Sequence, residues 1–114
     1  MVISQGEIWW ADIPEPIGSG PGYQRPVVVV QGDQFNRSRI GTVVCVPLTS
    51  NVTWANAPGN VYLSEDETNL PKPSVVNVSQ ITSLDKRLLT RRVGKLSFEN
   101  LQTILTGIDV ILGR

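Results

Sequence analysis

Short apolar runs, each interrupted by glycine, proline or asparagine, make up most of the first two thirds of the sequence. The 114 residues include 10 Gly and 8 Pro. This pattern favours many short antiparallel strands over a series of alternating strands and helices. Strands are expected over residues 7–12, 27–30, 42–46, 60–63 and 74–81.

Three of these segments carry more detailed predictions. The four valines of residues 27–30 are typical of a strand that is covered on both faces. Pro47 is expected to end the preceding strand, because proline cannot donate to a sheet ladder, and residues 48–51 then lie at or just past that end. Trp9 and Trp10 are adjacent on a strand and must face opposite ways, one into a core and one towards a dimer interface or a second face.

Two connections stand out. The Gly- and Pro-rich residues 13–22 form a loop longer than ordinary connectors, and such loops are more often functional. Residues 33–38 are expected to form a polar turn with Phe35 as its aromatic anchor.

The period of the apolar residues changes to that of a helix after Ser97. Ser97 is placed to cap an amphipathic helix of about 14 residues, and Gly113 to end it. Gly107 lies within this segment and costs about 1 kcal/mol relative to alanine, so either the helix weakens there or another segment packs close. The prediction is one domain over residues 1–114, a barrel or curled sheet with a helix at its end.

Composition excludes several classes of protein. The chain has no histidine, which removes the commonest general base and the commonest metal ligand. The single Cys45 cannot form an internal disulfide, and we expect it to be inert packing in a protein of the reducing cytosol. No apolar run approaches the roughly 20 residues of a membrane helix, and the N-terminus carries no export signal, so we expect a cytoplasmic protein without membrane contact.

The net charge is zero, but the charges are unevenly distributed. Between residues 68 and 95 only Asp85 opposes a set of basic side chains, namely Lys72, Lys86, Arg87, Arg91, Arg92 and Lys95. A basic face is one interpretation of this set, with Lys86, Arg87, Arg91 and Arg92 as the candidates for contact with an RNA backbone, and a solvated rim without a partner is the other.

None of the highly specific catalytic signatures, such as a phosphate-binding loop or a nucleophile elbow, occurs in the chain. The order of its segments is more informative. GEIWWAD (6–12), the Gly-rich loop, RPVVVV (25–30), VPLTSN (46–51), SVVNVSQI (74–81) and LDKRL (84–88) together resemble the MazF/PemK toxin family. The resemblance covers nearly the whole chain.

The resemblance implies a mainly β fold, an SH3-like antiparallel β-barrel with a C-terminal helix of the kind shared by CcdB, MazF and PemK. It also implies a homodimeric, sequence-specific endoribonuclease that cleaves single-stranded RNA without a metal or other cofactor, and a cognate MazE-like antitoxin. The substrate's own 2′-hydroxyl would be the nucleophile, leaving a 2′,3′-cyclic phosphate and a 5′-hydroxyl. Two alternatives remain, a toxin on the same fold that poisons DNA gyrase and a non-catalytic RNA- or protein-binding barrel.

Two residues match the catalytic positions of the family. Arg25 precedes the proline of RPV, and its guanidinium can grip two phosphoryl oxygens of the transition state. Thr49 in PLTS can donate its hydroxyl to a phosphate oxygen. The structural alternatives are a surface Arg25 paired with Asp12 or Asp33, and a Thr49 that closes a turn.

Base recognition requires hydrogen-bonding groups and flat side chains. The stacking candidates are Tyr23 and Trp54, and the polar candidates are Gln24, Asn36, Ser50, Asn51, Asn77 and Gln80. The chain also departs from its relatives: Gly20 stands where many have a glutamate, and Asn77 and Ser79 stand where one branch has Arg and Asp. The general base is therefore unassigned, with Asp12 and Asp33 as candidates near the matching motifs.

Overall fold

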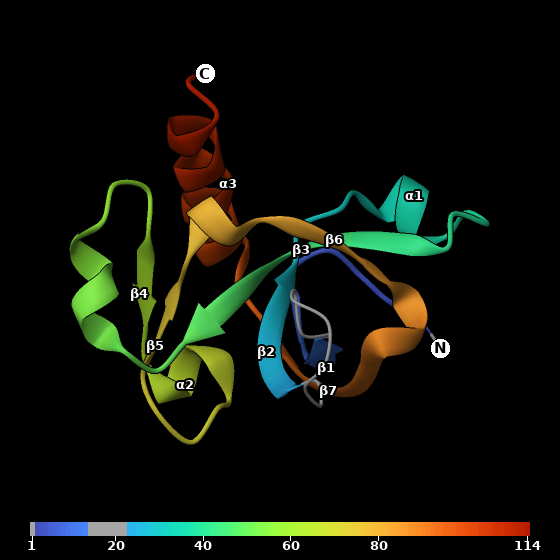
Figure 1. Ribbon diagram of the computed structural model, residues 1–114, viewed down its shortest axis with the longest axis horizontal. Coiled ribbons are helices and arrows are strands. Elements are labelled where there is room, and N and C mark those ends of the chain that lie inside the picture. The colour runs from blue at the N-terminus through green and yellow to red at the C-terminus, as the bar shows by residue number, and fades with distance from the viewer. Residues whose placement is uncertain (1, 14–22) are drawn as a thin grey trace.

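The computed structural model describes residues 2–13 and 23–114. Within these ranges the chain forms one curled antiparallel sheet (Figure 1) with the strands β1 (Glu7–Ile13), β2 (Tyr23–Val29), β3 (Thr42–Thr49), β4 (Val61–Leu63), β5 (Ser74–Val76), β6 (Thr82–Asp85) and β7 (Leu89–Lys95). The helical elements are α1 (Asp33–Asn36), α2 (Glu65–Thr68), α3 (Phe98–Ile111) and the 3-10 turns η1 (Val52–Asn56), η2 (Val78–Gln80) and η3 (Lys86–Leu88). The predicted mainly β fold with a C-terminal helix is confirmed.

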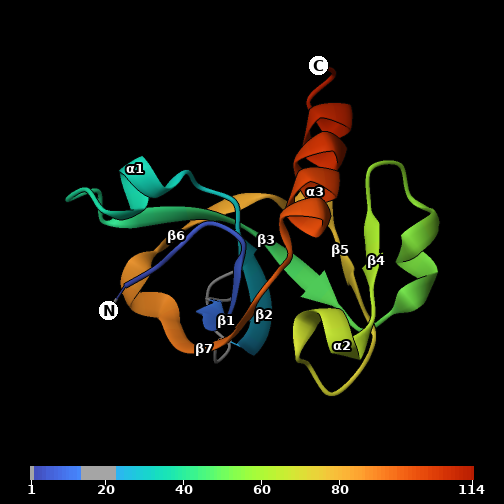
Figure 2. The same cartoon turned by 180° about the vertical axis from the view of Figure 1, so that it is seen from behind.

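Strand β3 is the centre of the sheet. One of its edges pairs with β2, which continues to β1 and β7. Its other edge pairs first with β6, over residues 42–45, and then with β5, over residues 48–49. Because β3 changes partner along its length, the sheet divides into two wings, which are visible from both sides in Figures 1 and 2.

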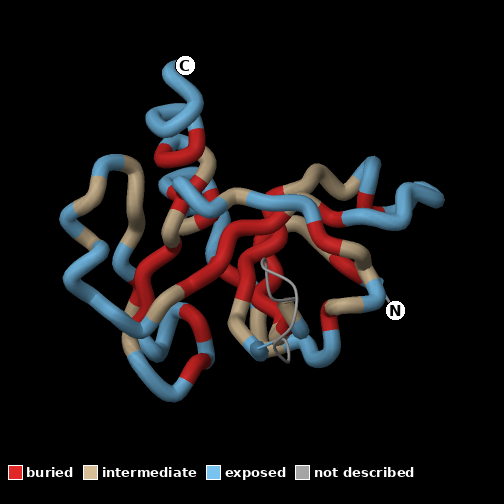
Figure 3. The backbone as a smooth tube through the Cα atoms, in the orientation of Figure 1, coloured by how far each residue is buried: buried red, intermediate tan, exposed pale blue. Residues whose placement is uncertain are grey.

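Two apolar clusters cover the two faces of β1, β2 and β3. One contains Ile8, Val28, Val46 and the inner face of α3, through Ile104 and Ile108. The other is formed by the alternate residues of the same strands, Trp9, Ala11, Val27, Val29, Val43 and Cys45, with Leu84 and Leu89. Burial on both faces explains the uninterrupted valines of β2 (Figure 3), and it confirms the prediction for that strand. Trp9 and Trp10 lie on opposite faces, as predicted.

The expectation that Pro47 ends its strand is wrong, because β3 continues to Thr49. The backbone carbonyl of Pro47 accepts a hydrogen bond of 3.0 Å from the Asn77 amide. In an extended strand the N–H and C=O of one residue point the same way, so the Pro47 nitrogen, which has no hydrogen to donate, faces the segment between the end of β5 and the start of β6. Proline is tolerated there because no ladder bond is lost.

The strand expected over residues 74–81 is wrong in its second half. Only Ser74–Val76 form β5, and the chain then turns through η2. Side chains offer the backbone an alternative to the ladder: Asn60 Oδ1 accepts from the Val78 amide at 3.0 Å, and Asn77 Oδ1 accepts from the Ser79 hydroxyl at 3.0 Å. Strands β6 and β7 and helix α2 were not predicted at all.

Residues 33–36 form α1 rather than an irregular turn, and Phe35 is not its anchor, since half of its surface is exposed. The neighbouring Asn36 is buried instead. Its Nδ2 donates to the Gln31 carbonyl at 2.9 Å and to Asp33 Oδ1 at 3.1 Å, and its Oδ1 accepts from Gln31 Nε2 at 3.0 Å. A buried amide with three partners holds this segment.

Helix α3 begins and ends where the sequence predicts. Ser97 Oγ accepts from the Asn100 amide at 3.1 Å, and Gly113 adopts a φ of 74° just after the helix. Gly107 faces Gly59 so closely that a Cβ at Gly107 would overlap the backbone carbonyl of Gly59. Of the two outcomes expected at Gly107, a weakened helix or a close approach of another segment, the structure shows the close approach. Within the described ranges, no helix has the length and apolar character needed to cross a membrane.

Candidate active site

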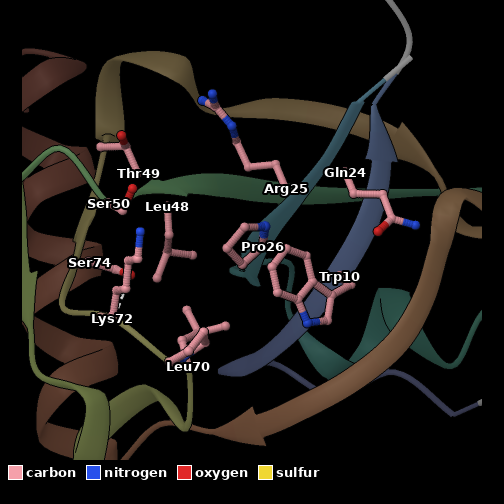
Figure 4. Close-up of a pocket in the computed structure, with 11 residues that line it drawn as sticks. Trp10, Gln24, Arg25, Pro26, Leu48, Thr49, Ser50, Leu70, Lys72 and Ser74 are labelled. Carbon is pink, nitrogen blue, oxygen red and sulfur yellow. Dashed lines mark hydrogen bonds between the residues drawn. The ribbon is translucent and has the colours of Figure 1, made fainter. Parts of the chain in front are cut away.

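An open pocket of about 280 Å³ lies where β2 begins and β3 ends. Val27 and Pro47 form the last pair of the β2–β3 register, and Arg25 precedes Val27 by two residues while Thr49 follows Pro47 by two, so both lie at the end where the two strands stop pairing. The segment between α2 and β5 forms the far wall (Figure 4). The lining residues are Trp10, Gln24, Arg25, Pro26, Leu48, Thr49, Ser50, Leu70, Pro71, Lys72 and Ser74. Arg25 and Thr49, assigned from separate motifs, thus belong to one pocket.

Arg25 is held beside the pocket without a carboxylate partner in the part of the chain that the structure describes. Its guanidinium carbon lies 5.1 Å from the centroid of the Tyr23 ring, a cation–π distance. Asp12 Oδ1 accepts from Gln24 Nε2 at 3.2 Å instead, and Asp33 Oδ1 accepts from the Gln5 amide at 2.7 Å. Neither carboxylate forms an ion pair with Arg25, and no other carboxylate among residues 2–13 and 23–114 does so.

Thr49 is the last residue of β3. Its Oγ1 accepts a hydrogen bond of 3.1 Å from the Asn51 amide, which fixes the oxygen and leaves the hydroxyl proton for donation. Thr49 therefore closes a turn and also faces the pocket. The structural role of Thr49 in the turn and its proposed role in the pocket are compatible, because the hydrogen bond from the Asn51 amide positions the Thr49 hydroxyl.

The floor of the pocket is apolar. Figure 4 shows the Trp10 ring, the Pro26 ring and the side chains of Leu48 and Leu70 below the polar groups of Arg25, Thr49 and Ser50. A flat apolar surface next to a cation and hydroxyl donors suits a ligand that combines a phosphate with an aromatic base.

Lys72 is a pocket residue that the sequence did not predict as functional. It lies between Pro71 and Pro73, in a segment that is distant in sequence from both Arg25 and Thr49. Besides its membership of the basic set of residues 68–95, its signal in the sequence is a cation held between two prolines, whose fixed φ angles restrict the backbone.

A second pocket of about 320 Å³ adjoins the first and shares Trp10, Leu70 and Pro71 with it. Its other lining residues are Asn69, Arg91, Arg92 and Val93. Arg91 and Arg92, which belong to the basic set of residues 68–95, thus lie on a pocket. Lys86 and Arg87 of that set lie elsewhere: Lys86 Nζ donates to the Asn36 carbonyl at 3.1 Å, and Arg87 pairs with Asp85 at 2.8 Å.

Glu7 fixes the position of Arg92. Its carboxylate is buried and accepts from Arg92 Nε at 2.6 Å, from Trp9 Nε1 at 3.1 Å and from the Ser4 amide at 2.7 Å. Burial alone would raise the pKa of Glu7, but the Ser4, Arg92 and Trp9 donors outweigh it and hold the pKa below its usual value.

The remaining predicted contact residues lie outside both pockets, apart from Gln24 and Ser50. Asn51 caps η1, its Oδ1 accepting from the Thr53 hydroxyl at 2.7 Å. Asn77 and Gln80 belong to η2 and its cap, and Gln80 is exposed. Tyr23 is exposed beside Arg25, whereas Asn36 is buried in α1. Trp54 is half exposed in η1.

Two further predictions concern individual residues. Gly18, Ser19 and Gly20, where relatives carry a glutamate, lie outside the residues that the structure describes. Cys45 is fully buried, and burial raises the pKa of its thiol to about 12, which agrees with its prediction as inert packing. Among residues 2–13 and 23–114 there is no cluster of three or more metal-ligating side chains.

The chain is similar to known proteins over nearly its whole length. A family model described as "PemK-like, MazF-like toxin of type II toxin-antitoxin system" matches residues 4–112. Endoribonuclease MazF6 of Mycobacterium tuberculosis H37Rv is 46% identical over 112 residues, which cover 98% of each chain.

Solved structures give the same result for the fold. The MazE-MazF structure (Form-II) from Deinococcus radiodurans matches with a TM-score of 0.81 at 22% identity, over 99% of this chain and 97% of that chain. An endoribonuclease from a mycobacterial species, in complex with its cognate antitoxin, matches with a TM-score of 0.73 at 24% identity, over 98% of this chain and 94% of that chain.

Proposed function

The chain belongs to the PemK-like, MazF-like toxins of type II toxin–antitoxin systems, and on this premise we propose that it is a sequence-specific endoribonuclease acting on single-stranded RNA. The observation that carries the proposal is the pocket that contains both Arg25 and Thr49. The curated relative at 46% identity is named an endoribonuclease and matches over nearly its full length.

The proposed reaction is an attack of the RNA on itself. The 2′-oxygen forms a bond to phosphorus, and the bond from phosphorus to the 5′-oxygen breaks. The products are a 2′,3′-cyclic phosphate and a 5′-hydroxyl. The protein has to align these three atoms and stabilise the charge that builds on the phosphoryl oxygens.

Arg25 and Thr49 are assigned to that charge. The guanidinium of Arg25 is permanently positive and offers paired donors to two phosphoryl oxygens, while the hydroxyl of Thr49 donates to one of them. Arg25 does not readily release a proton, so we assign it to transition-state stabilisation ahead of proton transfer.

Substrate contacts are assigned to the groups around these two residues. Gln24 and Ser50 line the same pocket, and Tyr23 lies beside Arg25 as a stacking surface. Asn51, Asn77 and Gln80 are proposed to contact bases beyond the pocket, on either side of the cleaved bond. The buried and fully bonded Asn36 is left out of the proposed site.

The proposal includes partners. We propose that a cognate antitoxin inhibits the chain, because a related mycobacterial endoribonuclease is known in complex with its antitoxin. We further propose that it acts in the cytoplasm as a homodimer of this single domain. Large apolar side chains that remain exposed at the end of α3, namely Val110, Ile111 and Leu112, offer surface for such contacts.

The test is incubation of the purified chain with a long single-stranded RNA in excess EDTA. We expect fragments that begin with a 5′-hydroxyl and end in a cyclic phosphate, which mass spectrometry separates from a linear phosphate by one water. The Arg25→Ala variant should lose about 10²–10³ in rate.

Intact RNA, or fragments with 5′-phosphate ends, would contradict the proposal. RNA binding without turnover would favour the non-catalytic barrel. Inhibition of DNA gyrase that survives Arg25→Ala would favour the gyrase-poisoning toxin.

A further inference from the structure

Lys72 occupies the wall of the pocket that faces the end of β3. Figure 4 shows its amino group directed towards Ser50, next to Thr49, while the Arg25 guanidinium approaches from the start of β2. A phosphate held by Arg25 and Thr49 therefore has an ammonium group on the same side as the threonine.

The backbone of Lys72 is fixed although its side chain is exposed. Pro71 and Pro73 restrict the chain on both sides, and the hydroxyl of the buried Ser74 donates to the Lys72 carbonyl at 3.3 Å. The side chain thus extends from a rigid base, and no ion pair with a described carboxylate holds it away from the pocket.

The reaction needs a proton at the 5′-oxygen as that atom leaves phosphorus, because an alkoxide is a poor leaving group in water. The described residues that line the pocket include no carboxylate and, in a chain without histidine, no imidazole. Of the two cations there, an arginine does not readily deprotonate, whereas a lysine ammonium can transfer a proton. The hydroxyls of Thr49 and Ser50 are far weaker acids than an ammonium group.

We propose that Lys72 is a catalytic residue that protonates the 5′-oxygen, an inference that rests on the function proposed above. As the 2′-oxygen bonds to phosphorus, its proton passes to water. The bond to the 5′-oxygen breaks, and that oxygen takes a proton from the Lys72 ammonium. The resulting neutral amine regains a proton from water, so the enzyme returns to its starting state and no other reactant is needed.

The test compares two RNA substrates with one cleavage site, an ordinary one and one in which sulfur replaces the bridging 5′-oxygen. A thiolate leaves without protonation, so it does not need a general acid. In single-turnover cleavage we expect Lys72→Ala to lose about 100-fold or more on the oxygen substrate and to cleave the sulfur substrate at close to the native rate.

Two variants separate proton transfer from charge. Lys72→Arg keeps the positive charge but not the acid, and we expect it to stay slow on the oxygen substrate and to be near native on the sulfur substrate. Lys95→Ala removes one positive charge from an exposed position outside both pockets, and it should cleave both substrates like the native chain. Circular dichroism confirms that each variant is folded.

Three results would overturn the inference. They are native-like cleavage of the oxygen substrate by Lys72→Ala, an equal loss on both substrates, and full rescue by Lys72→Arg. In each case Arg25→Ala should still be slow on both substrates, so the proposed function would stand. If the native chain cleaves neither substrate, the proposed function itself fails.

Discussion

At the scale of single residues, polar groups in this chain are placed by specific hydrogen-bond partners. The Asn36 side chain makes three hydrogen bonds, two with Gln31 and one with Asp33, and the oxygen of Thr49 is held by the Asn51 amide. Glu7 accepts from two neighbours in sequence, Ser4 and Trp9, and from the distant Arg92. These partners decide which polar side chains are available to a ligand and which maintain the fold.

Glu7→Gln should destabilise the protein in a pH-dependent way. Because folding lowers the pKa of Glu7, its ionised form stabilises the native state above the ordinary pKa of 4.5, and this contribution is lost as the pH falls through the lower native value. The loss at pH 7 should be about 2 kcal/mol, the scale of hydrogen bonds to a charged group.

Urea unfolding of both chains at several pH values between neutral and strongly acidic measures this effect. The difference in unfolding free energy between the native chain and Glu7→Gln should be largest at neutral pH. It should shrink once the pH is low enough to protonate Glu7 in the native state. A constant difference across the whole range would show that the Glu7 charge does not contribute.

At the scale of elements, close packing and changes of partner shape the molecule. Helix α3 can approach the segment after η1 because Gly107 meets Gly59, which has a φ of 83°. Strand β3 serves three neighbours along its length. The pocket lies where β2 and β3 stop pairing and the chain before β5 crosses over them.

Gly107→Ala should destabilise the protein by about 1–3 kcal/mol, although alanine is the better helix former by about 1 kcal/mol. The added methyl group would overlap the backbone carbonyl oxygen of Gly59. This oxygen cannot rotate away as a flexible side chain could, so the backbone around Gly59 would have to shift. Thermal unfolding measures the effect. Thr106→Ala, at an exposed position of the same helix, is the control and should be neutral or slightly stabilising.

At this scale the sequence predicts those features that depend on neighbouring residues and fails for those that depend on distant ones. The period and caps of α3 depend on local sequence, so its bounds and the close approach at Gly107 are predictable. Pro47 misleads because its effect depends on which neighbour faces its missing donor, and that is decided by the distant residues of β5 and β6. Asn60 ends β5 by bonding to Val78, a partner 18 positions away.

The residues of the candidate site also fall into two groups, those that the sequence predicts and those that only the fold brings to the pocket. Arg25 and Thr49 lie in recognisable motifs, whereas Trp10 reaches the pocket from β1, where it pairs with Pro26 of β2, and Lys72 reaches it from the segment between α2 and β5. Strand β7 was missed because its run LTRRVGK is mostly polar, as an outer strand with an exposed face can be. A pocket that is assembled from four separate segments cannot be deduced from the composition of any one of them.

At the scale of the whole molecule, a chain with zero net charge has a basic surface at the candidate site. Within the described residues, the two adjoining pockets are lined by Arg25, Lys72, Arg91 and Arg92 and by no carboxylate. Acidic residues lie elsewhere, for example Glu65, Asp66 and Glu67 in the first turn of α2. This separation of charge suits binding of a polyanion.

The pH dependence of cleavage should show no sigmoidal step between about pH 6 and pH 8, because the chain has no imidazole to titrate there. Measurements of kcat/KM for a short RNA as a function of pH, in buffers of constant ionic strength, test this expectation. A step near pH 6.5 in this profile would contradict the expectation and would mean that a carboxyl group with a raised pKa or the substrate itself titrates there.

The central claim is that Arg25 and Thr49 act on one phosphate. Single-turnover cleavage by the native chain, Arg25→Ala, Thr49→Val and the double variant measures their coupling. We predict a loss of about 10²–10³ for the arginine variant and a smaller loss for the threonine variant, with the double variant little slower than Arg25→Ala alone. A double variant whose loss equals the product of the two single losses would contradict the claim.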